Sequence, residues 1–366
     1  MKNIKIYLLL IPAFLNFGCS DFTHRGKVVS FKEFDNQISL SGISCSEIRD
    51  DIYPMFLGIK DSILVLCDVQ SDPHVYVYSL PYLKYLGSFG SQGVGPGELL
   101  DPLFWGQFEN NPQSQKAWFY QPNTMRYSLI DIQKAISGND YTEFDKQIIM
   151  SPQIGTAVNI ISIDENTIVA SGRVSEGEFM IYNTLTEETR WMPFLIDFNK
   201  TFMDEIKNAR MFNSYKQGII KIKPDGTRFV KAFGYVPVID VYNDKAKLLF
   251  SIIQDGYRKP KIITNQNNHF APETRVYYTN VFLSDKCIYA LNQNCTLQEL
   301  GEGKGVNVEI HMFSWTGDPL YKIVLNEGIG AMAPFAVDEL NKNIYVVNPQ
   351  KMNDYLSVFD IGEIEY

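Results

Sequence analysis

Short apolar stretches separated by turn residues fill almost the whole chain. From residue 50 onward these stretches are bounded by Gly, Pro, Asn or Asp, and few of them show the spacing of an amphipathic helix. Continuous or alternating apolar stretches between turn residues are typical of β-strands. The pattern therefore predicts an all-β protein.

The predicted strands fall into groups of four that repeat along the chain. The second strand of successive groups begins near residues 62, 116, 167, 228, 286 and 343, which gives a period of 51 to 61 residues. A four-stranded unit with about this period is typical of a β-propeller blade, which buries its faces by stacking against neighbouring blades. We therefore predict a six-bladed β-propeller over residues 27–366.

The sixth group is one strand short. Its three strands are predicted at Met332–Val337, Asn343–Val347 and Tyr355–Ile361, and an unassigned strand is predicted at Lys27–Phe34. Adding an N-terminal strand to the last blade would close the ring and remove a free sheet edge. We therefore predict that Lys27–Phe34 closes the last blade.

Helical patterns are confined to the connections between strands. They occur at Glu47–Asp51, at Ile132–Ser137 before Gly138, and at Thr201–Arg210, where apolar residues share one face. We interpret them as insertions on one rim of the ring.

Residues 1–18 have the features of an export signal. Two lysines precede the apolar run Ile6–Phe17, and Gly18 precedes Cys19. About 12 apolar residues are too few for a membrane-spanning helix, which needs about 20, so we expect cleavage. A small residue followed by Cys resembles the bacterial lipoprotein signal and predicts an acylated, palmitate-bearing Cys19 on a tether, residues 19–26. The alternative is an ordinary cleaved signal in which this Cys is incidental.

Composition and charge narrow the classes of partner. Hydrophobic residues make up 45% of the chain and charged residues 20%, which excludes a disordered protein. The net charge of -9 argues against nucleic-acid binding, and loss of the two signal lysines makes it -11. Because such a body is repelled by anionic headgroups, we expect membrane attachment through the lipid alone.

Four cysteines remain after the predicted cleavage: Cys45, Cys67, Cys287 and Cys295. The last two are eight residues apart across a predicted strand and turn, which permits a disulfide in an exported protein. Buried free thiols are the favoured interpretation.

Two stretches of sequence resemble a known family. Leu86–Glu98 (LGSFGSQGVGPGE) is similar to the linker motif of TolB-like six-bladed propeller lipoproteins of Bacteroidetes, which also resemble NHL-repeat propellers. Lys223–Val230 (KPDGTRFV) and the following Val238–Tyr242 resemble the turn and strand typical of their blades. The resemblance implies the propeller fold and export. It implies no activity, because we know of no catalytic residues common to the family.

Motifs of enzymes are weak or missing. Gly90–Gly97 lacks the spacing of a phosphate-binding loop, and Gly328–Ala333 is followed by Pro334 and a predicted strand where a dinucleotide site needs a helix. Neither GxSxG nor HExxH occurs, and the four histidines are far apart in the sequence. We therefore predict no enzymatic activity and no cofactor.

A metal ion in the central channel is the basis of the alternative function, a channel-centred hydrolase or lyase. Propeller hydrolases such as lactonases bind their metal with carboxylates and Asn of the innermost strands. Only one carboxylate stands among the candidates here, so a divalent cation would lack charge compensation and we predict no metal site. The candidates are Tyr53, Trp105, Gln107, Asn159, Lys221, Asn280 and Asp338.

Aromatic and Arg side chains near strand ends are the best binding candidates, although aromatic residues also fill the space between blades. The predicted ligand-binding residues are Trp105, Tyr120, Arg173, Arg210, Tyr235 and Arg258. The two longest predicted loops, Asp197–Gln217 and Tyr257–Val276, carry basic residues in an acidic chain, which favours an acidic ligand such as a uronate or an anionic peptide.

Together these observations predict a monomeric lipoprotein of the outer membrane. We expect it to be a non-enzymatic binding or scaffolding module for a glycan, a peptide or an envelope protein. A structural subunit of an envelope complex is a further alternative.

Overall fold

The computed structural model of the chain describes residues 22–24, 26–49, 51–138, 142–154, 157–172, 177–193, 196–198, 218–258, 260–263, 269–302, 307–330, 333–348 and 355–365. The predicted signal, Cys19 and the predicted helix Thr201–Arg210 lie outside these residues. Within them, no helix is long and apolar enough to cross a membrane.

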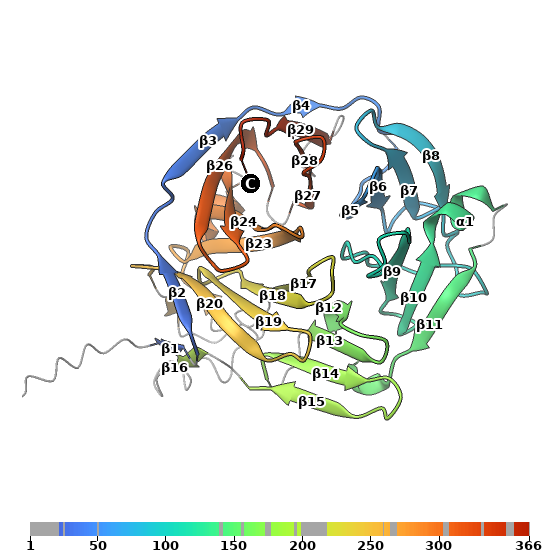
Figure 1. Ribbon diagram of the computed structural model, residues 1–366, viewed down its shortest axis with the longest axis horizontal. Helices are drawn as coiled ribbons and strands as arrows, with labels where there is room; N and C mark the ends of the chain where they lie inside the picture. Colours follow the sequence, from blue (N-terminus) through green and yellow to red (C-terminus); the bar gives the residue numbers. More distant parts are fainter. Residues whose placement is uncertain are drawn as a thin grey trace, which may run out of the picture.

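Six antiparallel sheets, called blades 1 to 6 in chain order, surround a common axis (Figure 1). In blades 1 and 3 to 6 the first strand in the sequence lies nearest the axis, whereas in blade 2 the segment of residues 102–108, called the inner segment, takes this place. Blade 1 contains β5 (Phe56–Lys60), β6 (Ile63–Cys67), β7 (Val75–Ser79) and β8 (Lys84–Phe89). Blade 2 contains β9 (Lys116–Gln121), β10 (Arg126–Asp131) and β11 (Phe144–Ile149), and blade 3 contains β12 (Ala157–Ser162), β13 (Thr167–Gly172), β14 (Phe179–Asn183) and β15 (Thr189–Met192).

The longest strands of the ring are in blade 5. Blade 4 contains β17 (Gly218–Ile222), β18 (Arg228–Phe233), β19 (Val238–Asn243) and β20 (Leu248–Gln254). Blade 5 contains β23 (Arg275–Leu283), β24 (Cys287–Thr296), β25 (Asn307–Ser314) and β26 (Pro319–Gly328). Blade 6 contains β27 (Phe335–Asp338), β28 (Asn343–Val347) and β29 (Leu356–Asp360). Two further pairs are β1 (Phe22–His24) with β16 (Ile196–Phe198), and β21 (Ile262–Ile263) with β22 (His269–Phe270). The predicted six-bladed propeller is confirmed.

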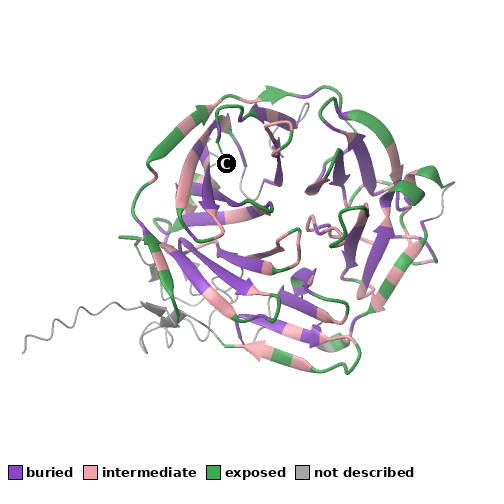
Figure 2. Ribbon diagram, viewed as in Figure 1, coloured by how far each residue is buried: buried purple, intermediate pink, exposed green. Residues whose placement is uncertain are grey.

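Burial explains why so many strands are apolar on both faces (Figure 2). In β6, Ile63, Val65 and Cys67 pack in the core between blades 1 and 2, whereas Leu64 and Leu66 pack in the core between blades 1 and 6. A strand that is covered on both sides loses the alternation of polar and apolar residues seen in a half-exposed sheet. Stacking of neighbouring blades therefore accounts for the continuous apolar run in this strand.

The N-terminal segment runs along the outside of three blades (Figure 1). Within this segment, called the belt (residues 26–44), β2 (Val28–Phe31) pairs with β20 of blade 4 and β3 (Asn36–Leu40) pairs with β26 of blade 5, both in parallel. Then β4 (Ile43–Ser44) pairs antiparallel with β29 and supplies the outer strand of blade 6.

An N-terminal strand thus closes the last blade as predicted, but the predicted segment, Lys27–Phe34, is wrong. Blade 6 is the ring neighbour of blade 1, so the residues that directly precede blade 1 lie at blade 6 and earlier residues lie at blades 5 and 4. The closing strand has only two residues, Ile43 and Ser44, and leaves no apolar pattern in the sequence.

The helices also differ from the predictions. The expected helix at Ile132–Ser137 is α1, begun by the Asp131 side chain and ended at Gly138, but no helix forms at Glu47–Asp51, where residues 46–48 make a turn and a bend. The helix α4 (Leu297–Gly301) was not predicted, although Thr296 and Glu299 form a capping box.

The two helices lie on opposite faces of the ring. Because neighbouring strands are antiparallel, the turns between first and second and between third and fourth strands share one face, the turn face. The turns between second and third strands and the links between blades share the other face, the connection face. In the sequence, α1 follows β10, which is the third strand of blade 2 when the segment of residues 102–108 is counted as the first. The helix α4 follows β24, the second strand of blade 5. Of the expected insertions, residues 47–49 lie in the link between blades 6 and 1 on the connection face, whereas α1 lies on the turn face. The expectation that these insertions share one rim is therefore wrong.

The thiols of Cys45, Cys67, Cys287 and Cys295 are buried and do not form disulfides with one another. Cys287 and Cys295 both lie on β24, so they are separated by about 26 Å at about 3.3 Å per residue. A disulfide needs Cα atoms within about 7 Å, so these two residues cannot form one.

Candidate functional site

The structure distributes the predicted binding residues over different places. Tyr120 is fully buried between blades 2 and 3, so its predicted role as an accessible ligand contact is wrong. Its side chain lies in the core between two blades, and the sequence pattern does not distinguish such a position from one on a rim. Tyr235 is half-buried on the connection face, with its ring centroid 4.5 Å from that of Phe270. Arg173 and Arg210 lie outside the described residues.

The other two predicted residues line cavities. Trp105 lies in the wall of the central channel, and Arg258 lies in a cleft of about 540 Å³ on the connection face. The cavity that contains Arg258 is called the connection-face cleft, and it opens between blades 4 and 5 beside the belt. Its lining comes from Lys32, Glu33, Phe34, Gln37, Gln254, Asp255, Gly256, Tyr257, Arg258, Arg275, Tyr277, Asn292, Asn294, Glu309, His311 and Lys322.

Basic side chains gather in the connection-face cleft. Lys32, Arg258 and Arg275 are exposed there, and the Lys322 side chain is 29% exposed. Their acidic neighbours are Glu33, Asp255 and Glu309. The cleft therefore carries a small excess of positive charge on a chain whose net charge is -9.

A polar network connects the floor of this cleft to its edge. On β25, Glu309 and His311 are two residues apart and face the same side of the sheet. His311 Nε2 lies 3.0 Å from Glu309 Oε2, and His311 Nδ1 lies 3.2 Å from the Tyr278 hydroxyl. Farther out, Asn294 Nδ2 donates to Glu309 Oε1 over 3.1 Å, and Arg275 donates to Asn294 Oδ1 over 2.8 Å.

Burial sets the protonation of this network. It lowers the pKa of His311 below its usual value, although the hydrogen bond with Glu309 opposes that effect. For Glu309, burial acts to raise the pKa, but hydrogen bonds from His311 and Asn292 and the charge of Lys322 lower it overall. Burial also raises the pKa of Tyr278, so its hydroxyl remains a donor to Nδ1. A neutral His311 can direct Nε2–H at Glu309 and accept from Tyr278 at Nδ1, which leaves neither ring nitrogen free to act as a base. Asn292 Nδ2, which also lies 3.1 Å from Nε2, then donates to Glu309 Oε2 over 3.2 Å.

His311, Glu309 and Tyr278 were not among the predicted site residues. The available signal was the Glu-x-His spacing inside a predicted strand, which places both side chains on one face. Tyr278 comes from a different strand, β23, and no local pattern connects it to them.

Most polar side chains expected in the channel connect neighbouring blades. Gln107 Nε2 donates to the Ser162 carbonyl over 2.6 Å and thereby connects blades 2 and 3. The Ile220 backbone N–H donates to Asn159 Oδ1 over 2.9 Å between blades 3 and 4. Tyr53 precedes β5 and is 49% exposed. These side chains therefore stabilise the ring and are not placed as metal ligands.

The central channel is a cavity of about 360 Å³ with a charged mouth on the turn face. Acidic residues at this mouth are Asp61, Glu109, Asp285, Asp338 and Glu339. The side chain of Asp338 accepts hydrogen bonds from Asn341, and Glu339 accepts them from Ser284 and Tyr289. In the described part of the chain, no group of three His, Cys, Asp or Glu residues is placed to hold a metal ion.

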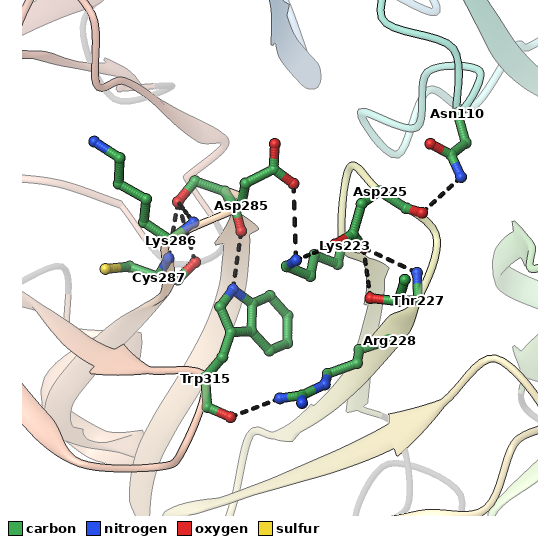
Figure 3. Close-up of polar contacts among 10 residues, drawn as sticks. Asn110, Lys223, Asp225, Thr227, Arg228, Asp285, Lys286, Cys287 and Trp315 are labelled. Atoms are coloured by element: carbon green, nitrogen blue, oxygen red, sulfur yellow. Dashed lines mark hydrogen bonds and ion pairs between the residues drawn. The ribbon is translucent and has the colours of Figure 1, made fainter.

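The turn Lys223–Thr227, part of the motif used for the family resemblance, lies at this mouth (Figure 3). Asn110 of blade 2 donates to the Asp225 carbonyl over 2.6 Å. Lys223 Nζ lies 5.5 Å from the ring centroid of Trp315, which belongs to the turn after β25 in blade 5. Gly226 has φ +72, and a Cβ there would lie 2.7 Å from Asn110 Nδ2. The turn therefore joins blades 2, 4 and 5 and has a structural role.

The chain is similar to one known family and to solved structures. A family described as TolB-like 6-blade propeller-like matches residues 33–340. A DUF4221-family protein from Bacteroides vulgatus has a TM-score of 0.55 at 12% identity over 89% of this chain and 96% of that chain. A protein from Bacteroides fragilis described as exported has a TM-score of 0.54 at 11% identity over 91% and 99%. No curated protein matches significantly. At these identities the solved structures show the fold alone.

Proposed function

Because the chain belongs to the TolB-like six-bladed propeller family, as its two motifs predicted, we propose that it is an exported envelope lipoprotein that binds an acidic ligand without transforming it. Export is supported by the predicted signal, residues 1–18, and by the description of the similar Bacteroides fragilis protein as exported. We place the protein at the outer membrane, as a monomer anchored through Cys19, with a glycan, a peptide or an envelope protein as its partner.

The observation that carries the binding proposal is the positive charge of the connection-face cleft. Arg258 and Arg275 are exposed at its edge, and Arg guanidinium groups bind carboxylates through paired, charge-assisted hydrogen bonds. The hydrogen bond from Arg275 to Asn294 continues inward to Glu309 and His311, which gives the edge a fixed position. Two neighbouring cations on an acidic body, one of them held in place, attract anionic ligands.

The same network argues for binding without chemistry. Both nitrogens of His311 have partners, and the burial that lowers its pKa keeps it neutral. No specific observation favours the alternative of a channel-centred hydrolase or lyase. Divalent-metal-dependent hydrolysis of lactones or esters by the purified protein would contradict the proposal.

Replacing Arg258 and Arg275 with Ala should weaken binding of an oligogalacturonate at least about tenfold, because each charge-assisted hydrogen bond contributes about 1.5–3 kcal/mol. Isothermal titration calorimetry measures the affinity, with neutral maltohexaose and hexaglutamate as comparison ligands. The charge-matched control is Lys84→Ala with Lys134→Ala, since both lysines are exposed away from the cleft. Equal binding of the acidic and neutral ligands, or an unchanged double Arg variant, would show that this cleft is not the site.

Replacing Cys19 with Ser should move the protein from the membrane fraction to the soluble fraction, because acylation requires the thiol and the acidic body has no other means of attachment. Fractionation of envelopes after a salt wash measures this, and a normal melting temperature confirms folding. Cys45→Ser is the control, since Cys45 is a buried thiol of the propeller. A Cys19→Ser variant that still sediments with membranes would refute the lipid anchor.

A further inference from the structure

One cation crosses the central channel from blade 4 to blade 2. Lys221 on β17 donates from Nζ to the carbonyl of Trp105, which lies in the inner segment of blade 2. This inner segment makes only isolated bridges to β9, at Leu103 and Phe108, and Gly106 within it has φ +73. The glycine lets the segment bend at the channel wall, and a Cβ there would lie 3.6 Å from Lys221 Nζ.

Lys221 forms no ion pair with any described residue. An ammonium group has three N–H donors, and the Trp105 carbonyl accepts only one of them. Another lysine at this end of the channel, Lys223, is paired with Asp225 and lies 3.9 Å from Asp285. Lys221 differs from it, because Lys221 has unused donors and no described carboxylate lies within ion-pair distance of its Nζ.

The lining of the channel around Lys221 is mixed, with charged residues at its mouth and apolar residues farther in. The deeper lining of the channel includes Leu57, Val281, Phe335 and Val337, which are buried. The Trp105 ring lies 5.7 Å from Lys221 Nζ, and its buried indole N–H has no hydrogen-bond partner among the described residues. The wall thus combines one unpaired cation, a further polar donor and an apolar floor.

We propose that the central channel binds a small organic monoanion, with its charged group on Lys221 and its apolar body on the channel floor. A carboxylate supplies acceptors for the free N–H donors of Lys221 and the counterion that this side chain lacks. A volume of about 360 Å³ fits a ligand of this kind, and pockets for small ligands are typically apolar with a few placed polar groups. This site is separate from the connection-face cleft and does not depend on the function proposed there.

Ligand affinity should depend on pH through Lys221. Burial lowers the pKa of Lys221 to about 7, so the amine loses its proton within the range in which proteins are commonly studied. The other charged groups of the channel lining are carboxylates and lysines, and no His is among the described residues that line it. The charged residues of the lining other than Lys221 are Lys60, Asp61, Glu109, Lys223, Asp285, Lys286, Asp338 and Glu339. Because only the protonated amine attracts an anion, affinity should fall as the pH rises through 7.

The test is a ¹⁹F NMR titration of the full-length mature protein with 4-fluorobenzoate and with its neutral analogue 4-fluorobenzamide. We expect the benzoate to bind at least about tenfold more tightly than the amide near pH 6, and we expect its affinity to fall about tenfold by about pH 8.5. Lys221→Met should remove the preference for the anion, whereas Lys84→Met, an exposed lysine on the outer edge of blade 1, should keep it.

Lys221→Arg separates charge from titration. It should keep the preference for benzoate but lose its dependence on pH, because a guanidinium stays protonated. This variant also keeps a cation that can bridge blades 2 and 4, so it addresses the case in which Lys221→Met does not fold. Equal affinity for the two probes in the wild type, full benzoate binding by Lys221→Met, or the same pH dependence in Lys221→Arg would overturn the proposal.

Discussion

Removal of the belt, residues 26–44, should lower the melting temperature by about 10 °C or more. The belt covers the outer edges of blades 4, 5 and 6 through β2, β3 and β4. It also contributes Phe31, which is 4% exposed and packs against Phe313 with ring centroids 5.1 Å apart. Loss of a buried Phe side chain alone lowers the free energy of unfolding by about 3–5 kcal/mol. In a large domain each kcal/mol lost lowers the melting temperature by about 2 °C.

A series of N-terminal truncations tests whether each belt strand contributes separately. Truncations that begin the chain at residue 35, 42 or 45 remove β2, then β3, then β4, and should lower the melting temperature in successive steps. A chain that begins at residue 26 keeps all three strands and is the control. Differential scanning calorimetry measures each variant. If only the last truncation lowers the melting temperature, then β2 and β3 contribute nothing and closure of blade 6 is the whole effect.

Replacement of Lys231 with Met should destabilise the propeller by about 3–5 kcal/mol, because it leaves buried carboxylates without their cation. Lys231 on β18 is fully buried between blades 3 and 4. Its Nζ lies 3.3 Å from Glu178 Oε1 and donates to the Glu178 carbonyl over 2.7 Å. Asp240, also fully buried, lies opposite Lys231 on the neighbouring strand β19.

A double-mutant cycle separates the charge effect from the loss of packing. Glu178→Gln alone leaves Lys231 with a weaker partner, and the combination Lys231→Met with Glu178→Gln should cost less than the sum of the two single changes. Chemical unfolding with guanidinium chloride measures all four proteins. Additive losses would mean that the ion pair contributes nothing beyond packing.

The sequence contained enough information for the blades. The second strands were predicted to begin near residues 62, 116, 167, 228, 286 and 343. The observed strands β6, β9, β13, β18, β24 and β28 begin at Ile63, Lys116, Thr167, Arg228, Cys287 and Asn343. These strands are visible because both of their faces are covered by neighbouring blades, so each appears as a short apolar run between turn residues. The helix α1 was visible because Gly138 marks its end. Such signals are local, and each requires only a few consecutive residues.

The inner segment of blade 2 shows where local signals fail. The period places a first strand of blade 2 before the second strand at Lys116, but the segment found there, residues 102–108, makes only two isolated bridges to β9. The bend at Gly106 separates those bridges and lets Lys221 reach the Trp105 carbonyl from blade 4. An apolar run alone does not reveal that its backbone hydrogen bonds are interrupted.

The sequence by itself determined the strand content, the period of the blades and the shortage of one strand in the last group. Only the tertiary structure decided that Ile43–Ser44 closes blade 6, that Tyr120 is buried in a core, and that Glu309, His311 and Arg275 share one cleft with Arg258. The physical reason is that strand formation and burial of a blade depend on neighbouring residues, whereas edge pairing and cavity lining depend on which blades meet in the ring. The order of the blades in the ring brings together residues hundreds of positions apart, such as Phe31 and Phe313, and no local sequence pattern encodes that order.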